Sequence, residues 1–466
     1  MTLPSLGSSS LQSFFRQSKL TDWLLCILGS LLSFRMYWQI GYELTRTQSR
    51  ELLLNFSGLF LIYGIVVTRR WDKRWIKRWL GIGVAFRLLF LLSVPVLSDD
   101  YFRFIWDGRL AAAGYNPYLY LPSQVIHSAV AGEAHLDKLL FEGLNSPHYF
   151  TVYPPLNQLM FLLSAWIGGN EVQLSVILLR VFILLAEGGV IWLMFHPTKP
   201  TALPLKKANN RQWGLLYALN PLVIAELTGN LHFEAVTLFF VLLAVRWLER
   251  PLKADKYGVG SAIALGLGAA VKLVPLLFLP LFMKRLGFVK GIRYSLISGA
   301  VLGILFIPFF RWELVLNFAE SLDLYFQKFE FNASFYYLFR EAGYWLTGYN
   351  PIQVLGPLLS LATLTSLVWI AFQRRSFLEK MLYSLTVYFL LATTVHPWYI
   401  TTLVGLGALT RRWYPVVWSA LLPLTYVAYS SVPYHENLRI AALEYILVLG
   451  CLCYEVFFKG LDWEAS

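Results

Sequence analysis

Long apolar runs alternate with short polar stretches over most of this chain. Runs such as residues 20–40, 52–68 and 172–195 are largely free of charged side chains. Their length, roughly 17 to 25 residues, is what a helix needs to cross the hydrocarbon core of a membrane. Because the pattern recurs to the end of the chain, we predict an all-α, polytopic transmembrane helical bundle with about 12 spans.

The composition supports a membrane protein and changes how the charge is interpreted. Hydrophobic residues make up 57% of the chain and charged residues 14%, far from the average of soluble proteins. The net charge of +12 does not predict a nucleic-acid partner, because the basic residues form short blocks between apolar runs. The blocks lie at residues 69–79, 199–211, 284–293, 374–375 and 411–412. By the positive-inside rule these blocks are cytoplasmic, and both termini are predicted to be cytoplasmic as well.

Three parts follow from this topology. Residues 1–79 hold two N-terminal spans and a cytoplasmic basic loop. Residues 80–310 form a central module with an external loop over residues 98–152. Residues 311–466 hold an external stretch, residues 311–350, and the C-terminal spans. Apolar residues at helical spacing in that stretch predict amphipathic helices lying along the membrane surface.

Two segments depart from a simple crossing. The apolar core within residues 153–169 is only about 15 residues long, which favours a re-entrant or surface helix over the alternative of a full span. Residues 257–283 carry Lys272 in the middle of an apolar run, which favours a broken helix or a hairpin.

Two adjacent carboxylates, Asp99 and Asp100, follow the apolar run that ends near residue 97. A helix starting there places Arg103 and Asp107 on the carboxylate side, and the turn at residues 114–117 ends it. Carboxylates at a lipid boundary are costly unless they face water, a partner or a substrate. The stretch therefore predicts half of an active site, with helix N-capping by either aspartate as the alternative.

Other ionisable residues are predicted to reach the same external side. They are His232 and Glu234 in the loop GNLHFE, His396 in HPWY, and the pair His435 and Glu436. For His396 the alternative is an interfacial histidine bonded to a backbone carbonyl, and for Lys272 it is snorkelling or pairing with a carboxylate. The three cysteines lie in apolar runs, and the chain contains no Gly-rich phosphate loop, GxSxG or HExxH motif.

Five segments in order carry a family resemblance. They are DDYFRFIWDGRLAAAGYNPYLY, VYPPLNQ, NPLVIAELTGNLHFE, AAVKLVP and HPWYI. Together they resemble the GT-C membrane glycosyltransferases, in particular the bacterial polyprenol-phosphate-mannose-dependent, mannosyltransferase-like proteins, and are similar to the catalytic subunit of the first GPI mannosyltransferase. The family's Asp-x-Asp motif is altered here, with Ser98 in the first position and Asp100 in the second.

The resemblance implies an inverting transferase that moves a hexose such as mannose from a polyprenyl-phosphate donor to a glycan, lipid or protein acceptor on the external face. It implies a GT-C-like catalytic module over residues 80–310, with Asp100 as general base and Asp99 beside it. The donor phosphate would meet Arg103, Arg109, Lys272 and His396, and the substrate would meet Tyr153, Asn230, His232 and Glu234. No metal ligands are assigned, and a divalent metal is left open.

Two other functions fit a chain with many spans and buried charges. One is a flippase or transporter of a lipid-linked sugar, which would favour repeated halves with matching broken helices. The other is a polymerase or ligase that joins preassembled glycans. In each case the chain is a multi-pass integral membrane protein, of the plasma (inner) membrane if the source is bacterial, surrounded by membrane lipids.

Overall fold

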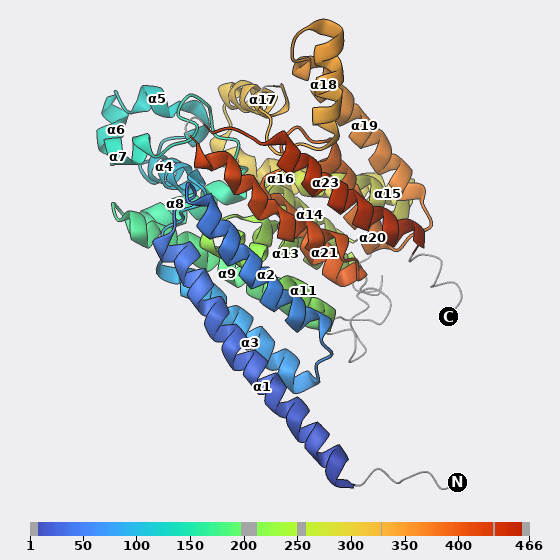
Figure 1. Cartoon of the computed structure of the whole chain (residues 1–466). Helices are drawn as coiled ribbons and strands as arrows, with labels where there is room; N and C mark the ends of the chain where they lie inside the picture. Colours follow the sequence, from blue (N-terminus) through green and yellow to red (C-terminus); the bar gives the residue numbers. More distant parts are fainter. Residues whose placement is uncertain (1–7, 197–211, 249–257, 328, 432–433, 459–466) are drawn as a thin grey trace.

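The computed structural model describes residues 8–196, 212–248, 258–327, 329–431 and 434–458 (Figure 1). Within these ranges the chain is helical, and no β-strand forms. An isolated parallel bridge joins Phe331 to Thr394. The prediction of an all-α membrane bundle is confirmed. The basic block at residues 199–211 lies outside the described ranges.

Six described helices are long and apolar enough to cross a membrane. Three are single helices: α2 (Ser49–Thr68), α9 (Val172–Phe195) and α19 (Ile352–Phe372). Three consist of two consecutive elements each. Lys19–Glu43 comprises most of α1 (Ser8–Trp38) and η1 (Gln39–Glu43), Phe288–Phe309 comprises α16 (Phe288–Phe306) and η7 (Ile307–Phe309), and Leu438–Phe458 comprises α23 (Leu438–Cys453) and η10 (Tyr454–Phe458). A seventh candidate is a pair of segments, Pro221–Gly229 and Glu234–Leu248, bent by 110°. The total of about 12 crossings stays a prediction.

A broken helix is present where Lys272 predicted one. Helix α14 (Val259–Val271) ends at Lys272, whose backbone is extended (φ −151°, ψ 136°). The chain continues as η6 (Val274–Phe278) and α15 (Leu279–Leu286). Pro275 lies in the first turn of η6, where its missing N–H is not needed for a helical hydrogen bond.

Helix α4 (Asp100–Ala112) begins at the predicted aspartates and is buried along most of its length. It packs on α8 (Pro155–Gly168), and a Cβ atom at Gly108 would lie only 2.3 Å from the Phe161 carbonyl oxygen. Tyr101 and Ile105, on another face of the helix, are buried in protein and do not face lipid. The helix ends before Gly114, which has a φ of +85°.

Short helices gather at one end of the bundle, which we call the loop end (Figure 1). They are η3 (Pro117–Leu119), α5 (Pro122–Val125), α6 (Ala129–Glu133), α7 (Lys138–Glu142), α17 (Trp312–Gln327) and α18 (Phe335–Thr347). Two hydrogen bonds join the early and late segments: Asn116 Nδ2 donates to the Phe309 carbonyl (2.7 Å), and Asn317 Nδ2 donates to the Tyr118 carbonyl (3.0 Å).

The amphipathic character predicted for residues 311–350 is present. Trp312 on α17 is 67% exposed and Trp345 on α18 is 95% exposed. These large apolar side chains suit a membrane surface. Within the 98–152 loop, α6 and α7 are separate helices, and His135 between them takes a positive φ of 52°.

The remaining elements complete the bundle around the site. They are α3 (Lys73–Leu89), η2 (Phe90–Leu92), η4 (Gln212–Gly214), α11 (Leu215–Ala218), α12 (Pro221–Val223), η5 (Ile224–Gly229), α13 (Glu234–Leu248), α20 (Phe377–Leu391), η8 (Pro397–Tyr399), α21 (Ile400–Thr410), α22 (Tyr414–Leu421) and η9 (Leu422–Ser430). Helix α21 packs against α11 and α13, which brings the C-terminal part of the chain onto the predicted catalytic module.

Candidate active site

The two adjacent aspartates have different surroundings. Asp99 occupies the N-cap position of α4 but makes no side-chain cap hydrogen bond, and its Oδ2 atom lies 2.5 Å from Nη1 of Arg46. Asp100 accepts a hydrogen bond from Nδ2 of Asn145 at 2.8 Å. The Asp100 backbone N–H donates to the Ser98 hydroxyl (3.3 Å). The Ser98 hydroxyl therefore accepts a hydrogen bond at the start of the helix. The two carboxylates do not cap the helix and are instead bound to Arg46 and Asn145.

The Asp100 carboxyl lies outside the long apolar helices, and its environment disfavours ionisation. Burial raises the pKa of Asp100, and the nearby carboxylates of Asp99 and Glu234 raise it further. The hydrogen bond from Asn145 and the charge of Lys272 act in the opposite direction. A carboxyl with a raised pKa is a stronger base when it is deprotonated, which is the property that general-base catalysis needs.

The segment that faces Asp100 is a strained turn between η5 and α13. Leu231 is buried and has a positive φ of 63°, a conformation that a branched residue rarely adopts. Arg180 on α9 is fully buried and donates to the carbonyls of Thr228 (2.7 Å), Gly229 (3.1 Å) and Leu91 (2.9 Å). Arg180 thus fastens the turn to the segment that leads toward the aspartates.

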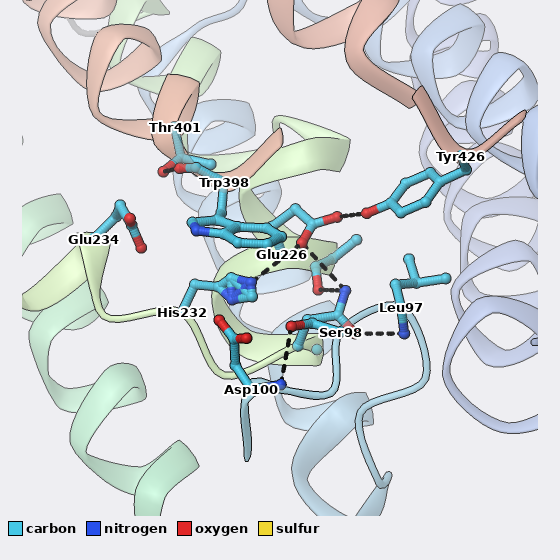
Figure 2. A network of polar contacts seen from close by, with 12 residues as sticks. Leu97, Ser98, Asp100, Glu226, His232, Glu234, Trp398, Thr401 and Tyr426 are labelled. Atoms are coloured by element: carbon cyan, nitrogen blue, oxygen red, sulfur yellow. Dashed lines mark hydrogen bonds and ion pairs between the residues drawn. The ribbon is translucent and has the colours of Figure 1, made fainter. Parts of the chain in front are cut away.

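His232, on this turn, lies beside Asp100 in Figure 2. The His232 side chain is 2% exposed, and its Nε2 atom has no hydrogen-bond partner within the described residues. The ring meets Trp398 edge to face, with 3.7 Å between the centroids. An unpartnered polar atom in a buried place is costly, so a substrate group is a natural partner for it.

Glu226 is a carboxylate of the site that sequence reasoning did not select. It is fully buried, it accepts hydrogen bonds from the Tyr426 hydroxyl and from Asn230 Nδ2 (3.4 Å), and its Oε2 atom lies 3.9 Å from His232 Nε2 (Figure 2). A glutamate within the apolar run of residues 221–227 is itself a signal, because charges in such runs are usually functional.

Asn230 and Glu234 also lie at the site. Asn230 Oδ1 accepts from the Leu97 backbone N–H (3.2 Å), which ties the turn to the aspartate segment. Glu234 begins α13 and pairs with Lys272 Nζ. The Lys272 ammonium lies 4.0 Å from the centroid of the Tyr399 ring. The alternative for Lys272, pairing with a carboxylate, is therefore what the structure contains.

A cavity of about 60 Å³ opens beside this ion pair. Glu234 and Lys272 line its polar end, and most of the other lining side chains are apolar. The wall includes Val241, Val274, Pro275, Phe278, Leu385 and Phe389. A ligand with an anionic head and an apolar tail matches such a lining.

His396 stacks on Trp398, with 4.4 Å between the centroids and 6° between the planes. Phe331 stacks on the other side at 5.0 Å. Burial and the charge of Lys272 lower the pKa of His396 to about 3, so the imidazole is neutral. It can accept or donate one hydrogen bond, but it is not a cation.

Three other predicted residues have contacts away from this cluster. Arg103 is buried and pairs with Asp107 (2.8 Å), and it also donates to two carbonyls of the 98–152 loop. Arg109 donates to the carbonyls of His135 (2.7 Å) and Asn170 (2.8 Å). Tyr153 packs edge to face on Phe104 and Phe161. The guanidinium groups of Arg103 and Arg109 are thus bound to carbonyl groups of the protein.

A metal site is not apparent from the geometry. Within the ranges that the structure covers, no group of three or more His, Cys, Asp or Glu side chains is arranged to hold a metal ion. The carboxylates of the site are instead engaged by Arg46, Asn145, Tyr426 and Lys272.

The fold and the site define a helical membrane protein with a buried cluster of carboxylates and imidazoles. Residues 4–286 match the family model described as alpha-(1->6)-mannopyranosyltransferase, N-terminal domain. The match covers more than half of the chain, which belongs to this family of GT-C type mannosyltransferases. Among curated proteins and solved structures, none matches this chain. The site also draws on Trp398, His396 and Tyr426, which lie beyond the matched residues.

Proposed function

We propose that this membrane glycosyltransferase moves a mannosyl group from a polyprenyl-phosphate donor to a hydroxyl of a glycan, lipid or protein acceptor on the external face. The observation that carries the proposal is Asp100, a carboxyl with a raised pKa that lies beside His232 and within reach of the Lys272 charge. The family description, an alpha-(1->6)-mannopyranosyltransferase, supports mannose as the sugar.

The chemistry requires one base and one place for a departing phosphate. The acceptor oxygen attacks the anomeric carbon while its proton passes to Asp100, and a new C–O bond forms. The bond from the anomeric carbon to the phosphate oxygen breaks, and the phosphate leaves with the electron pair. Lys272, at the polar end of the cavity, would stabilise that developing charge. Neutral His396 could donate a hydrogen bond but supplies no charge.

A single displacement inverts the anomeric centre. An α-linked product therefore requires a β-linked donor. The alternative of a covalent intermediate would need a second carboxylate held across the sugar ring, about 5 Å from the first. Asp99 is engaged by Arg46, which makes it an unsuitable nucleophile.

The direct test is a transfer assay with purified protein in nanodiscs and a defined β-linked polyprenyl-phosphate mannose. We expect release of polyprenyl phosphate and formation of an α-mannoside on a mannosyl acceptor, identified by NMR. Transport of the donor across a vesicle membrane without formation of a product would favour the flippase alternative. Transfer of a preassembled glycan, with no transfer of a single mannose, would favour the ligase.

A further inference from the structure

The ammonium group of Lys272 is occupied at the point where the proposed donor phosphate would bind. Its side chain is 34% exposed, whereas that of its partner Glu234 is 6% exposed. Lys272 emerges at the break between α14 and η6, and Glu234 emerges from the first turn of α13. The pair therefore bridges two elements at the polar end of the cavity.

The Lys272 side of the pair is accessible to a ligand, because that side chain is 34% exposed. The attraction between the two charges is offset by the hydration and side-chain freedom that each partner loses when the pair forms, so a competing anion can open the pair. The phosphodiester of a sugar-carrying donor has one negative charge, as a carboxylate does, and its oxygen atoms accept charge-assisted hydrogen bonds, so it can take the place of Glu234 on Lys272. The apolar wall formed by Val274, Pro275 and Phe278 would receive the lipid chain behind the phosphate.

The charges around the pair favour this exchange. Asp100, Glu226 and Glu234 are carboxyl groups of one site, and the charge of Glu234 raises the pKa of Asp100. A phosphate that shared the Lys272 ammonium with Glu234 would bind more weakly than one that held the ammonium alone, because two anions would compete for one cation.

We infer that Glu234 is the resting counter-ion of the phosphate site: the lipid phosphate displaces Glu234 from Lys272, so competition from Glu234 weakens phosphate binding. The inference rests on the proposed function, because it takes the donor to be a lipid phosphate. It assigns Glu234 a role in setting donor affinity rather than in forming the glycosidic bond.

The test measures the Kd of a short-chain polyprenyl monophosphate, without sugar, for the full-length protein in nanodiscs. Glu234→Gln removes the competing charge and should lower Kd by about fivefold, the change expected when Lys272 is free for about a fifth of the time. Lys272→Gln should raise Kd. In the double variant, which carries both substitutions, Glu234→Gln should not lower Kd further than in Lys272→Gln alone, because the lysine that it would release is absent.

Two controls separate competition from a general loss of negative charge. Asp100→Asn removes one charge from the same site but leaves the Lys272–Glu234 pair in place. Equal tightening by Asp100→Asn and Glu234→Gln, or tightening that persists in the double variant, would overturn the inference. Uncharged polyprenol is the second control, and its binding should be the same in the wild type and in Glu234→Gln.

The outcomes also separate this inference from the proposed function. If the wild type binds the phosphate through Lys272 but Glu234→Gln leaves Kd unchanged or raises it, only the inference fails. If the wild type does not prefer polyprenyl phosphate to polyprenol, the proposed donor fails with it. Should Glu234→Gln fold poorly, Glu234→Asp shortens the reach toward Lys272 and should also lower Kd.

Discussion

The Oδ2 atom of Asp99 lies 2.5 Å from Nη1 of Arg46, whereas the neighbouring Asp100 accepts a hydrogen bond from the neutral amide of Asn145. An arginine beside a carboxylate stabilises its charged form and makes it a weaker base. A neutral amide does so to a smaller extent. Two residues that are adjacent in sequence are therefore expected to differ in chemistry.

This difference predicts unequal effects of two matched substitutions. Asp100→Asn keeps the size of the side chain but removes the proton acceptor, so turnover should fall by about 10²–10⁴. Asp99→Asn should lower turnover less than Asp100→Asn, because it removes only the ion pair with Arg46. The measurement is the rate of mannosyl transfer at equal amounts of folded protein. Retention of more than about a third of wild-type turnover by Asp100→Asn would remove Asp100 as the base.

The raised pKa of Asp100 predicts the pH dependence of the reaction. A general base must be deprotonated, so kcat/KM should fall as the pH drops through a pKa above the usual range of aspartate. Asn145→Ala removes a hydrogen bond that lowers this pKa and should move the acid limb of the profile to higher pH. Ser146→Ala, one residue away, serves as the control. A limb that does not move in Asn145→Ala would contradict the assignment.

The same pKa has a consequence for stability, with a defined sign. The folded state binds the Asp100 proton more tightly than the unfolded chain does, so ionisation of this carboxyl at neutral pH disfavours the fold. This loss of folding free energy develops as the pH rises from the ordinary pKa of aspartate to the raised pKa of Asp100. At a pH below the ordinary pKa the carboxyl is protonated in both states and the loss is absent.

Arg180 is predicted to act as a positioning residue. Its guanidinium donates hydrogen bonds to three carbonyl groups, on the two segments that lead to Asp100 and to His232. A methionine at this position would leave those carbonyl groups without a donor. One buried polar group without a partner costs about 1–3 kcal/mol. Arg180→Met should therefore lower the thermal midpoint and reduce kcat more than donor affinity, and Arg180→Lys should restore part of kcat.

Arg412 provides a matched control for that prediction. Its guanidinium also donates to a backbone carbonyl, that of Glu455 (2.8 Å), and pairs with Glu379 (2.7 Å). Arg412→Met should lower the thermal midpoint without a comparable loss of kcat below that midpoint. If Arg180→Met and Arg412→Met changed kcat and stability in the same proportion, Arg180 would be structural only.

The predicted topology can be tested by labelling single cysteines. In a background that lacks the natural cysteines, Lys138→Cys should react with an impermeant reagent added to intact cells, and Lys290→Cys should not. Both positions are exposed, Lys138 with 84% of its side chain accessible. The basic block at residues 284–293 gives the physical reason for the cytoplasmic side. If position 290 were labelled and position 138 were not, the protein would have the opposite orientation in the membrane.

The sequence by itself determined much about the individual elements. The length of the apolar runs predicted the long helices, and the order Asp99–Asp100 to Gly114 predicted where α4 begins and ends. Lys272 within an apolar run predicted a break, which is present. These features depend on periodicity, backbone preference and the cost of charge in lipid, which are all local to a segment.

Only the tertiary structure decided which side chains meet. Glu226 meets Tyr426 from the far end of the chain, Trp398 covers His232, and Lys272 pairs with Glu234. Arg103 was expected at the donor phosphate but is buried against Asp107 and the loop carbonyls. Spacing along one helix fixes the face on which a residue lies, but the partner of that face depends on how separate helices pack. Packing is selected because an unpaired polar group in a dry interior is costly, so buried polar side chains must find partners. Those partners come from residues far apart in the chain.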